Sequence, residues 1–155
     1  MGILSLSALI GRRNAPDPSH PGIRNWYRRL DKPSYTPPDA VFGAVWPILE
    51  TSMAVGGYRL LRRTPSGRRS ASIGLWLATT GMIGGWTENF FRKHALAGSA
   101  TASGAILMTT AAYVATTHKV DHVAQQTAVP LLGWLAFATL LATRISQRNP
   151  ATGVQ

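Results

Sequence analysis

One acidic side chain, Glu50, stands alone among apolar and small residues from Ala40 to Tyr58. In a helix that begins near residue 40, it would lie about 15 Å from the helix start. An ionisable group at such a depth usually faces a cavity or a bundle interior, where the neutral acid is favoured. Trp46, Met53 and Gly57 share its helix face. This face predicts either a ligand or proton site or a structural, hydrogen-bonding glutamic acid.

Further tryptophans recur in apolar surroundings. Trp86 and Phe90 are one helical turn apart, and Trp134 follows Pro130 by one turn. An indole offers a flat, polarisable face and one N–H donor, which suit a flat apolar ligand. An aromatic side chain in such a helix is, however, more often packed in a core or against lipid. Spacing alone therefore makes these residues candidates for a pocket and no more.

Other reactive groups favour simpler interpretations. His118 and His122 have the spacing of a metal-binding pair, but they fall in a short expected loop. His94 would lie at the far end of the helix expected before that loop, so it cannot complete a site with them. Glu88 precedes Arg92 by four residues, the spacing of an ion pair at a helix end. No Ser-His-Asp set, phosphate loop or dinucleotide glycine motif occurs, and the chain has no Cys. We predict neither catalytic residues nor a metal site.

The charged residues leave four long stretches almost free of charge. Three contain no Asp, Glu, Lys or Arg, and the fourth contains only Glu50. Each has about 18 to 23 residues, enough to cross roughly 30 Å of bilayer hydrocarbon. A soluble helical bundle is the alternative, but its helices should show a polar face. We therefore predict an all-α integral membrane bundle with helices at about 40–61, 70–92, 97–117 and 123–144.

The net charge of +10 is concentrated at the ends of these stretches. Basic clusters at helix ends contact anionic headgroups, so we expect a lipid membrane as a partner. No base-stacking platform or recognition motif supports a nucleic-acid partner. Short loops make consecutive helices antiparallel, which places residues 24–32, 92–93 and 144–148 on one side. That side has a small excess of Lys and Arg, which favours a cytoplasmic C-terminus.

A basic, aromatic and proline-rich block precedes the first long stretch. Pro33, Pro37 and Pro38 oppose helix formation, so we expect a rigid loop that gives way to a helix only after Pro38. From Trp26 the block reads W-Y-x-x-L-x-K-P-x-x-T-P-P-x-x-V-F-x-x-x-W-x-x-L. It resembles the TspO family, the tryptophan-rich sensory proteins related to the mitochondrial translocator protein. Sparser matches continue to about residue 145, at Trp86-Thr87, Phe90-Phe91, Asp121, Val129-Pro130 and Trp134.

The resemblance implies a function and a set of ligand-binding positions. Members of this family are multi-pass membrane proteins that bind porphyrins, haem-like tetrapyrroles or similar hydrophobic molecules between their helices, for transport, sensing or regulation. It implies a cavity capped by the loop at residues 26–38, with porphyrin or haem as a ligand rather than a required cofactor. The positions implied are Trp26, Tyr35, Pro38, Phe42, Trp46, Glu50, Trp86, Phe90 and Trp134.

Two other functions stay open at this point. Family members have been proposed to break down porphyrins in light, which would make this chain an enzyme. The second open function is that of a divergent scaffold that binds no ligand. This chain has Glu50 where the family has Tyr, and it has Ile83 and Ala142 where the family often has Asn. The resemblance and the Gly81-x-x-x-Gly85 spacing agree with a homodimer, although small residues serve packing within one chain equally well.

The N-terminal residues depart from the family's first membrane helix. About ten largely apolar residues precede Arg12-Arg13, which is too short to span a bilayer. We expect a segment that lies on the membrane surface; a degenerate remnant, a start codon placed too far downstream and a signal peptide are the alternatives. The expected organisation is a short apolar segment and proline-rich linker at 1–24, a transmembrane domain at 25–145 and a tail at 146–155.

Overall fold

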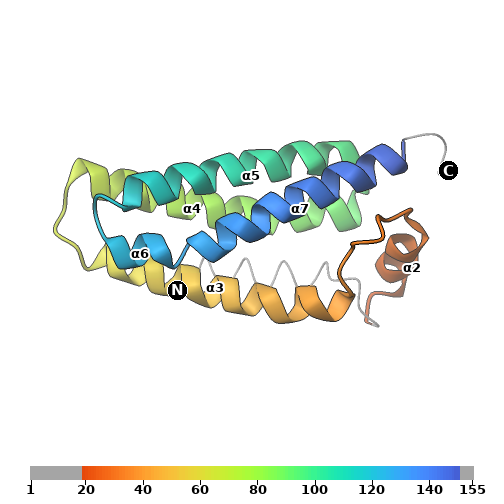
Figure 1. Ribbon diagram of the computed structural model, residues 1–155, viewed down its shortest axis with the longest axis horizontal. Coiled ribbons are helices and arrows are strands. Elements are labelled where there is room, and N and C mark those ends of the chain that lie inside the picture. Colours follow the sequence, from red (N-terminus) through yellow and green to blue (C-terminus); the bar gives the residue numbers. More distant parts are fainter. Residues whose placement is uncertain (1–18, 151–155) are drawn as a thin grey trace.

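The computed structural model describes residues 19–150, and within them every regular element is helical. Four long helices lie along one axis, and a short helix, α2, covers one end of them (Figure 1). We call this the α2 end and the opposite one, next to the short helix α6, the α6 end. The elements are α2 (Pro21–Arg29), α3 (Asp39–Leu61), α4 (Gly67–Thr87) with a π-helical turn η1 (Glu88–Arg92), α5 (Leu96–Thr117), α6 (His122–Gln126) and α7 (Val129–Arg148). The predicted all-α class and long helices are confirmed.

The region before α3 contains a helix that the sequence argument did not allow. Residues 21–29 form α2, whereas a linker to residue 24 and a loop up to Pro38 were expected. The prediction was wrong because Pro21 stands in the first helical turn, where no intrahelical N–H bond is lost. The three later prolines act only on residues 31–38, which are not helical. The expectations for the first 18 residues lie outside the described part of the chain.

The last predicted helix is divided in two. α6 ends at Gln126, and α7 begins at Val129 with Pro130 in its first turn. One continuous helix at 123–144 was predicted, but the Pro130 ring, which lacks an N–H donor, stands in the first turn of a new helix. The break at Thr127 and Ala128 changes the direction of the chain before it returns along α5 (Figure 1).

Two of the described helical segments are long and apolar enough to cross a membrane. They are α3, Asp39–Leu61, with a mean hydropathy of 1.2, and the stretch His122–Arg148, which combines α6 and α7 and has a mean hydropathy of 1.6. Only 22% and 33% of these stretches are buried, unlike core helices of a soluble protein. α4 and α5, with 21 and 22 residues, have the length but contain more Gly, Ser and Thr. Four spans were predicted, and this criterion supports two of them.

Small residues of α3 allow close helix contacts in the half of the bundle near the α6 end. A Cβ on Gly57 would lie 2.5 Å from Trp76 Cε2, and one on Gly56 would lie 2.6 Å from Thr127 Oγ1. The Trp76 indole also donates a 2.8 Å hydrogen bond to the Met53 carbonyl. Such small residues let the backbones of neighbouring helices approach closely. A Cβ on Gly81 or Gly85 would meet no atom within 4 Å, so these two do not mark contacts within the described chain.

At the α6 end, ion pairs of the buried Asp121 side chain join α3 and α6. Asp121 accepts hydrogen bonds from Arg63 Nε at 2.6 Å and Arg59 Nε at 3.2 Å, and its side chain is only 1% exposed. It also caps α6 through the Ala124 N–H at 2.9 Å. Burial alone would raise the pKa of Asp121, but the bonds from Ala124, Arg63 and Arg59 outweigh it and lower the pKa to about 2. This carboxylate therefore joins the end of α3 to the start of α6.

Candidate functional site

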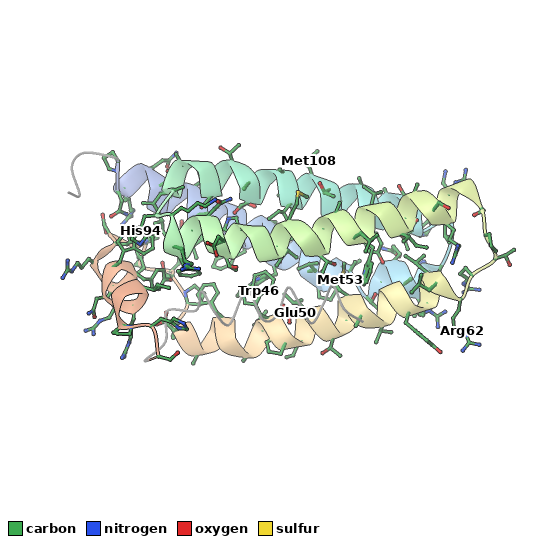
Figure 2. The ribbon with its side chains drawn as sticks, turned by 180° about the vertical axis from the view of Figure 1, so that it is seen from behind. Trp46, Glu50, Met53, Arg62, His94 and Met108 are labelled. Carbon is green, nitrogen blue, oxygen red and sulfur yellow. The ribbon has the colours of Figure 1, made fainter. Side chains whose placement is uncertain are left out.

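A small cavity lies where α3, α4 and α7 meet. Trp46, Leu49, Glu50 and Met53 line it from α3, together with Thr80, Ile83 and Leu131. Figure 2 shows three of these α3 residues following one another along the helix. The cavity measures about 10 Å³, room for about one water molecule. The predicted shared face is confirmed for Trp46, Glu50 and Met53, whereas Gly57 packs against Trp76 instead.

An aromatic wall extends from this cavity toward the α2 end. The rings of Phe42 and Trp134 meet edge to face with centroids 5.5 Å apart, and Phe137 follows at 5.6 Å from Trp134. The indole N–H of Trp134 is buried and has no hydrogen-bond acceptor within the described residues. Buried donors are normally paired, so this N–H is a candidate contact for a ligand.

A second aromatic cluster lies at the α2 end of the bundle. Trp86 stacks on Phe90 with centroids 4.9 Å apart, and Trp26 approaches Phe90 edge to face at 5.7 Å. The Trp86 indole donates to the Ser99 carbonyl at 2.8 Å. Trp86 contacts both the main core and this cluster, so it links the two. Tyr35 and Pro38 are exposed in the loop before α3, and neither lines the cavity.

The remaining charged candidates occupy the helix ends. Glu88 and Arg92 form the expected ion pair at 3.7 Å, with both side chains partly exposed. His118 and His122 face each other with their Nδ1 atoms 3.3 Å apart. Among residues 19–150 no group of three or more His, Cys, Asp or Glu could hold a metal ion.

Sequence reasoning missed the partner of Gly57 and the partners of Asp121. Trp76 is buried against α3, and Asp121 pairs with Arg59 and Arg63 some 60 residues earlier, at separations of 62 and 58 positions. The adjacent glycines Gly56 and Gly57 could have indicated a close helix contact, and Asp121 could have indicated a helix cap. Their partners could not be chosen, since several tryptophans and arginines stand at comparable distances along the chain.

A comparison with protein families identifies the chain. The model of the TspO/MBR family matches residues 3–148. The chain belongs to the TspO/MBR family. Among its relatives, the human translocator protein is 33% identical over 126 residues, covering 77% of this chain and 72% of that protein. The bovine translocator protein is 28% identical over 155 residues, covering 96% and 89%.

Bacterial members of the TspO/MBR family are similar to a comparable degree. The tryptophan-rich protein TspO of Chlorobaculum tepidum is 33% identical over 131 residues, covering 81% of this chain and 80% of that protein. The bundle is therefore a TspO-family membrane helical bundle, and its exposed apolar residues, such as Ile48 and Leu140, have lipid as their natural surroundings. The family assignment agrees with the resemblance seen in the block from Trp26 to Leu49.

Proposed function

We propose that this protein binds a flat hydrophobic ligand of the tetrapyrrole class between α3, α4 and α7. The proposal rests on Trp46 beside Glu50 in the cavity lining and on the Phe42–Trp134 ring pair one α3 turn nearer the α2 end. The buried Trp134 N–H lacks an acceptor among the described residues. Aromatic faces supply stacking surface, and the indole N–H and the carboxyl supply polar contacts that orient a macrocycle.

Ligand binding requires α3 to move. Drug-sized ligands occupy cavities of about 300–1,000 Å³, whereas this one has about 10 Å³. The Gly56 and Gly57 contacts and the Asp121 ion pairs hold α3 near the α6 end. Toward the α2 end, α3 meets α7 through the rings of Phe42 and Trp134. We therefore infer that α3 swings outward at the α2 end and that the ligand selects this wider state.

The proposal assigns a binding role in transport, sensing or regulation. Light-dependent breakdown of porphyrin is the enzymatic alternative, but the cavity offers Glu50 as its one carboxyl and no paired base. A scaffold without ligand is the other alternative. The binding role and these two alternatives predict different results when the purified protein is mixed with porphyrin.

The test measures porphyrin binding by the purified protein in lipid nanodiscs, first in the dark and then under illumination. Trp46→Ala and Trp134→Ala should each weaken binding by about 0.5–1.5 kcal/mol beyond the lost contact area, the usual value of an aromatic pair. Ile48→Ala is the matched control, because Ile48 lies on the same helix with 66% of its surface exposed. Unchanged affinity in both tryptophan variants would remove them from the site.

Illumination separates the alternatives. Binding without loss of the porphyrin absorbance supports the binding role, and loss that depends on Trp46 or Trp134 supports an enzyme. No binding at any porphyrin concentration supports the scaffold.

A further inference from the structure

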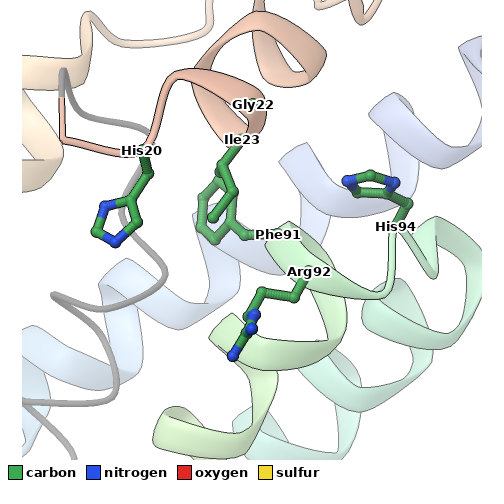
Figure 3. Close-up of a pocket in the computed structure, with 6 residues that line it drawn as sticks. All are labelled: His20, Gly22, Ile23, Phe91, Arg92 and His94. Atoms are coloured by element: carbon green, nitrogen blue, oxygen red, sulfur yellow. The ribbon is translucent and has the colours of Figure 1, made fainter.

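A second, larger cavity lies at the α2 end, apart from the candidate ligand site. It measures about 480 Å³ and is lined by His20, Gly22, Ile23, Phe91, Arg92 and His94. Figure 3 shows Ile23 and Phe91 between the side chains of His20, Arg92 and His94. None of these residues lines the cavity beside Glu50. The binding role proposed above makes no use of this region.

An unusual stretch of backbone forms one wall of this cavity. α4 widens into the π-helical turn η1, where the Lys93 N–H bonds to the Glu88 carbonyl. His94 then adopts a left-handed conformation with φ of 52°, which is uncommon for a residue other than glycine. Its ring stacks on Trp26 with centroids 4.0 Å apart. π-helical turns and strained residues concentrate at functional sites, since the surrounding structure must hold them in place.

The lining combines apolar surface with hydrogen-bond donors, one of which is charged. Ile23 and Phe91 provide hydrocarbon surface, while the Arg92 guanidinium and two imidazoles provide N–H donors. Arg92 also meets Glu88 at 3.7 Å, but both side chains are partly exposed, so this pair holds the guanidinium weakly. Gly22 and Ile23 belong to the first turn of α2, whose N–H groups have no acceptor within the helix.

The position of the cavity decides which anion suits it. The α2 end is one end of helices that are long and apolar enough to cross a membrane, and a bilayer around them places its headgroups at this end. A free anion such as phosphate would use the Arg92 guanidinium and the N–H donors alone, whereas an anionic lipid would also use the apolar surface. Basic groups at this level attract anionic headgroups.

We propose that this cavity binds the phosphate headgroup of an anionic membrane lipid. The phosphate contacts Arg92 and His94, and the glycerol and first acyl carbons lie against Ile23 and Phe91. Charge-assisted, two-pronged contacts between a guanidinium and a phosphate are among the stronger hydrogen bonds of proteins.

The four histidines of the chain provide the test. His20 and His94 line the cavity, whereas His118 and His122 lie at the α6 end. Short-chain phosphatidylglycerol is titrated into the protein in neutral detergent micelles, and the imidazole C–H resonances are followed by NMR. We expect saturable shifts of the His20 and His94 signals, with those of His118 and His122 unchanged. Phosphatidylcholine of the same chain length should shift none of them.

Variants and a free anion complete the experiment. Arg92→Gln should weaken phosphatidylglycerol binding about tenfold, the loss expected for one charged hydrogen bond. Lys93→Gln removes the same charge from the adjacent exposed residue, which does not line the cavity, and should leave the affinity unchanged. Circular dichroism checks that both variants remain helical.

Three outcomes would overturn the proposal. Equal weakening by Arg92→Gln and Lys93→Gln would mean that the lipid senses only the overall charge. Equal shifts at all four histidines would mean that the lipid does not select the α2 end. Inorganic phosphate that binds as tightly as phosphatidylglycerol would make this a site for a soluble anion.

Discussion

Two polar groups stand among apolar side chains between α3 and α7. One is the Glu50 carboxyl, which lines the small cavity, and the other is the buried Trp134 N–H. A buried polar group without a partner costs free energy relative to an apolar one of similar size. This cost makes the buried Trp134 N–H, together with the half-buried Glu50 carboxyl beside the cavity, a candidate ligand contact.

Substitution of Glu50 separates these two roles. Glu50→Gln keeps hydrogen-bonding capacity without a titratable proton, so folding and the binding of neutral ligands should be retained. Glu50→Leu should leave the protein at least as stable to heat in detergent, since an apolar group replaces a polar one, while porphyrin affinity falls. Thermal unfolding and a binding titration measure both effects.

The control for this pair is Thr51→Leu, which adds an apolar side chain at the neighbouring exposed position of α3. It should leave ligand affinity unchanged. If Glu50→Leu instead lowers the melting temperature and keeps full affinity, Glu50 is a structural residue.

At the scale of elements, α3 is held near the α6 end by close packing and by charge. Gly56 and Gly57 let the helix approach Thr127 and Trp76, and Arg69 of α4 donates to the carbonyls of Leu60 and Leu61 at the end of α3. Beyond that, Asp121 holds Arg59 and Arg63. These contacts fix one half of α3, and the half with Trp46 lines the candidate ligand site.

Adding one methyl group to α3 tests the close packing. Gly57→Ala should destabilise the protein by about 1–3 kcal/mol, the usual cost of overpacking, because the new Cβ would lie 2.5 Å from the Trp76 ring. Gly43→Ala is the matched control on the same helix, with nothing within 4 Å of its Cβ. It should stabilise α3 by up to about 1 kcal/mol through helix propensity. Similar melting temperatures for both variants would contradict the close contact.

Acid should weaken the connection between α3 and α6. The pKa of Asp121 is lowered from 3.8 to about 2 in the folded protein. A lowered pKa stabilises the fold above the unfolded value of 3.8, and this stabilisation is lost as the pH falls toward 2. The shift corresponds to at most about 2 kcal/mol, since partly exposed arginines are screened by solvent.

Asp121→Asn measures this contribution, because the amide keeps the shape and can still cap α6. The variant should be less stable than the wild type at pH 7, and the difference should shrink below about pH 4, near the ordinary pKa of Asp. A difference that stays constant down to pH 2 would show that the ion pairs with Arg59 and Arg63 contribute nothing to stability.

At the scale of the whole molecule, the long helices place the loops alternately at the two ends of the bundle (Figure 1). Ser34 and Lys93 lie at the α2 end, and Thr64 and Lys119 lie at the α6 end. All four residues are exposed. Since the chain has no Cys, single cysteines at these positions report the topology without background.

Labelling with an impermeant thiol reagent should divide the four positions into two pairs. Cysteines at Ser34 and Lys93 should be protected in intact cells and label after lysis, because the excess of basic residues favours a cytoplasmic α2 end. Cysteines at Thr64 and Lys119 should label in intact cells. Equal labelling of all four positions would contradict the membrane-crossing arrangement of α3 and α4.

The sequence predicted the long helices well because charge and length decide what crosses a bilayer. It also placed Trp46, Glu50 and Met53 together, since a helix fixes which residues share a face. It could not predict the closed cavity, because cavity volume depends on the distance between helices. α2 was missed because Pro33, Pro37 and Pro38 were taken to prevent a helix over the whole block, whereas they oppose helix formation only near their own positions.

The buried carboxylate at the α6 end restricts the routes by which a bound molecule leaves. A pump that moves cargo across a membrane opens to each face in turn, and opening toward the α6 end would separate Asp121 from Arg59 and Arg63. Separating these groups would lose their stabilisation of at most about 2 kcal/mol, since the two arginines are partly exposed. A ligand that enters beside α2 would then return the same way, so its occupancy follows the concentration in one compartment. Under the proposed binding role, the bound fraction would therefore report the ligand concentration of that compartment.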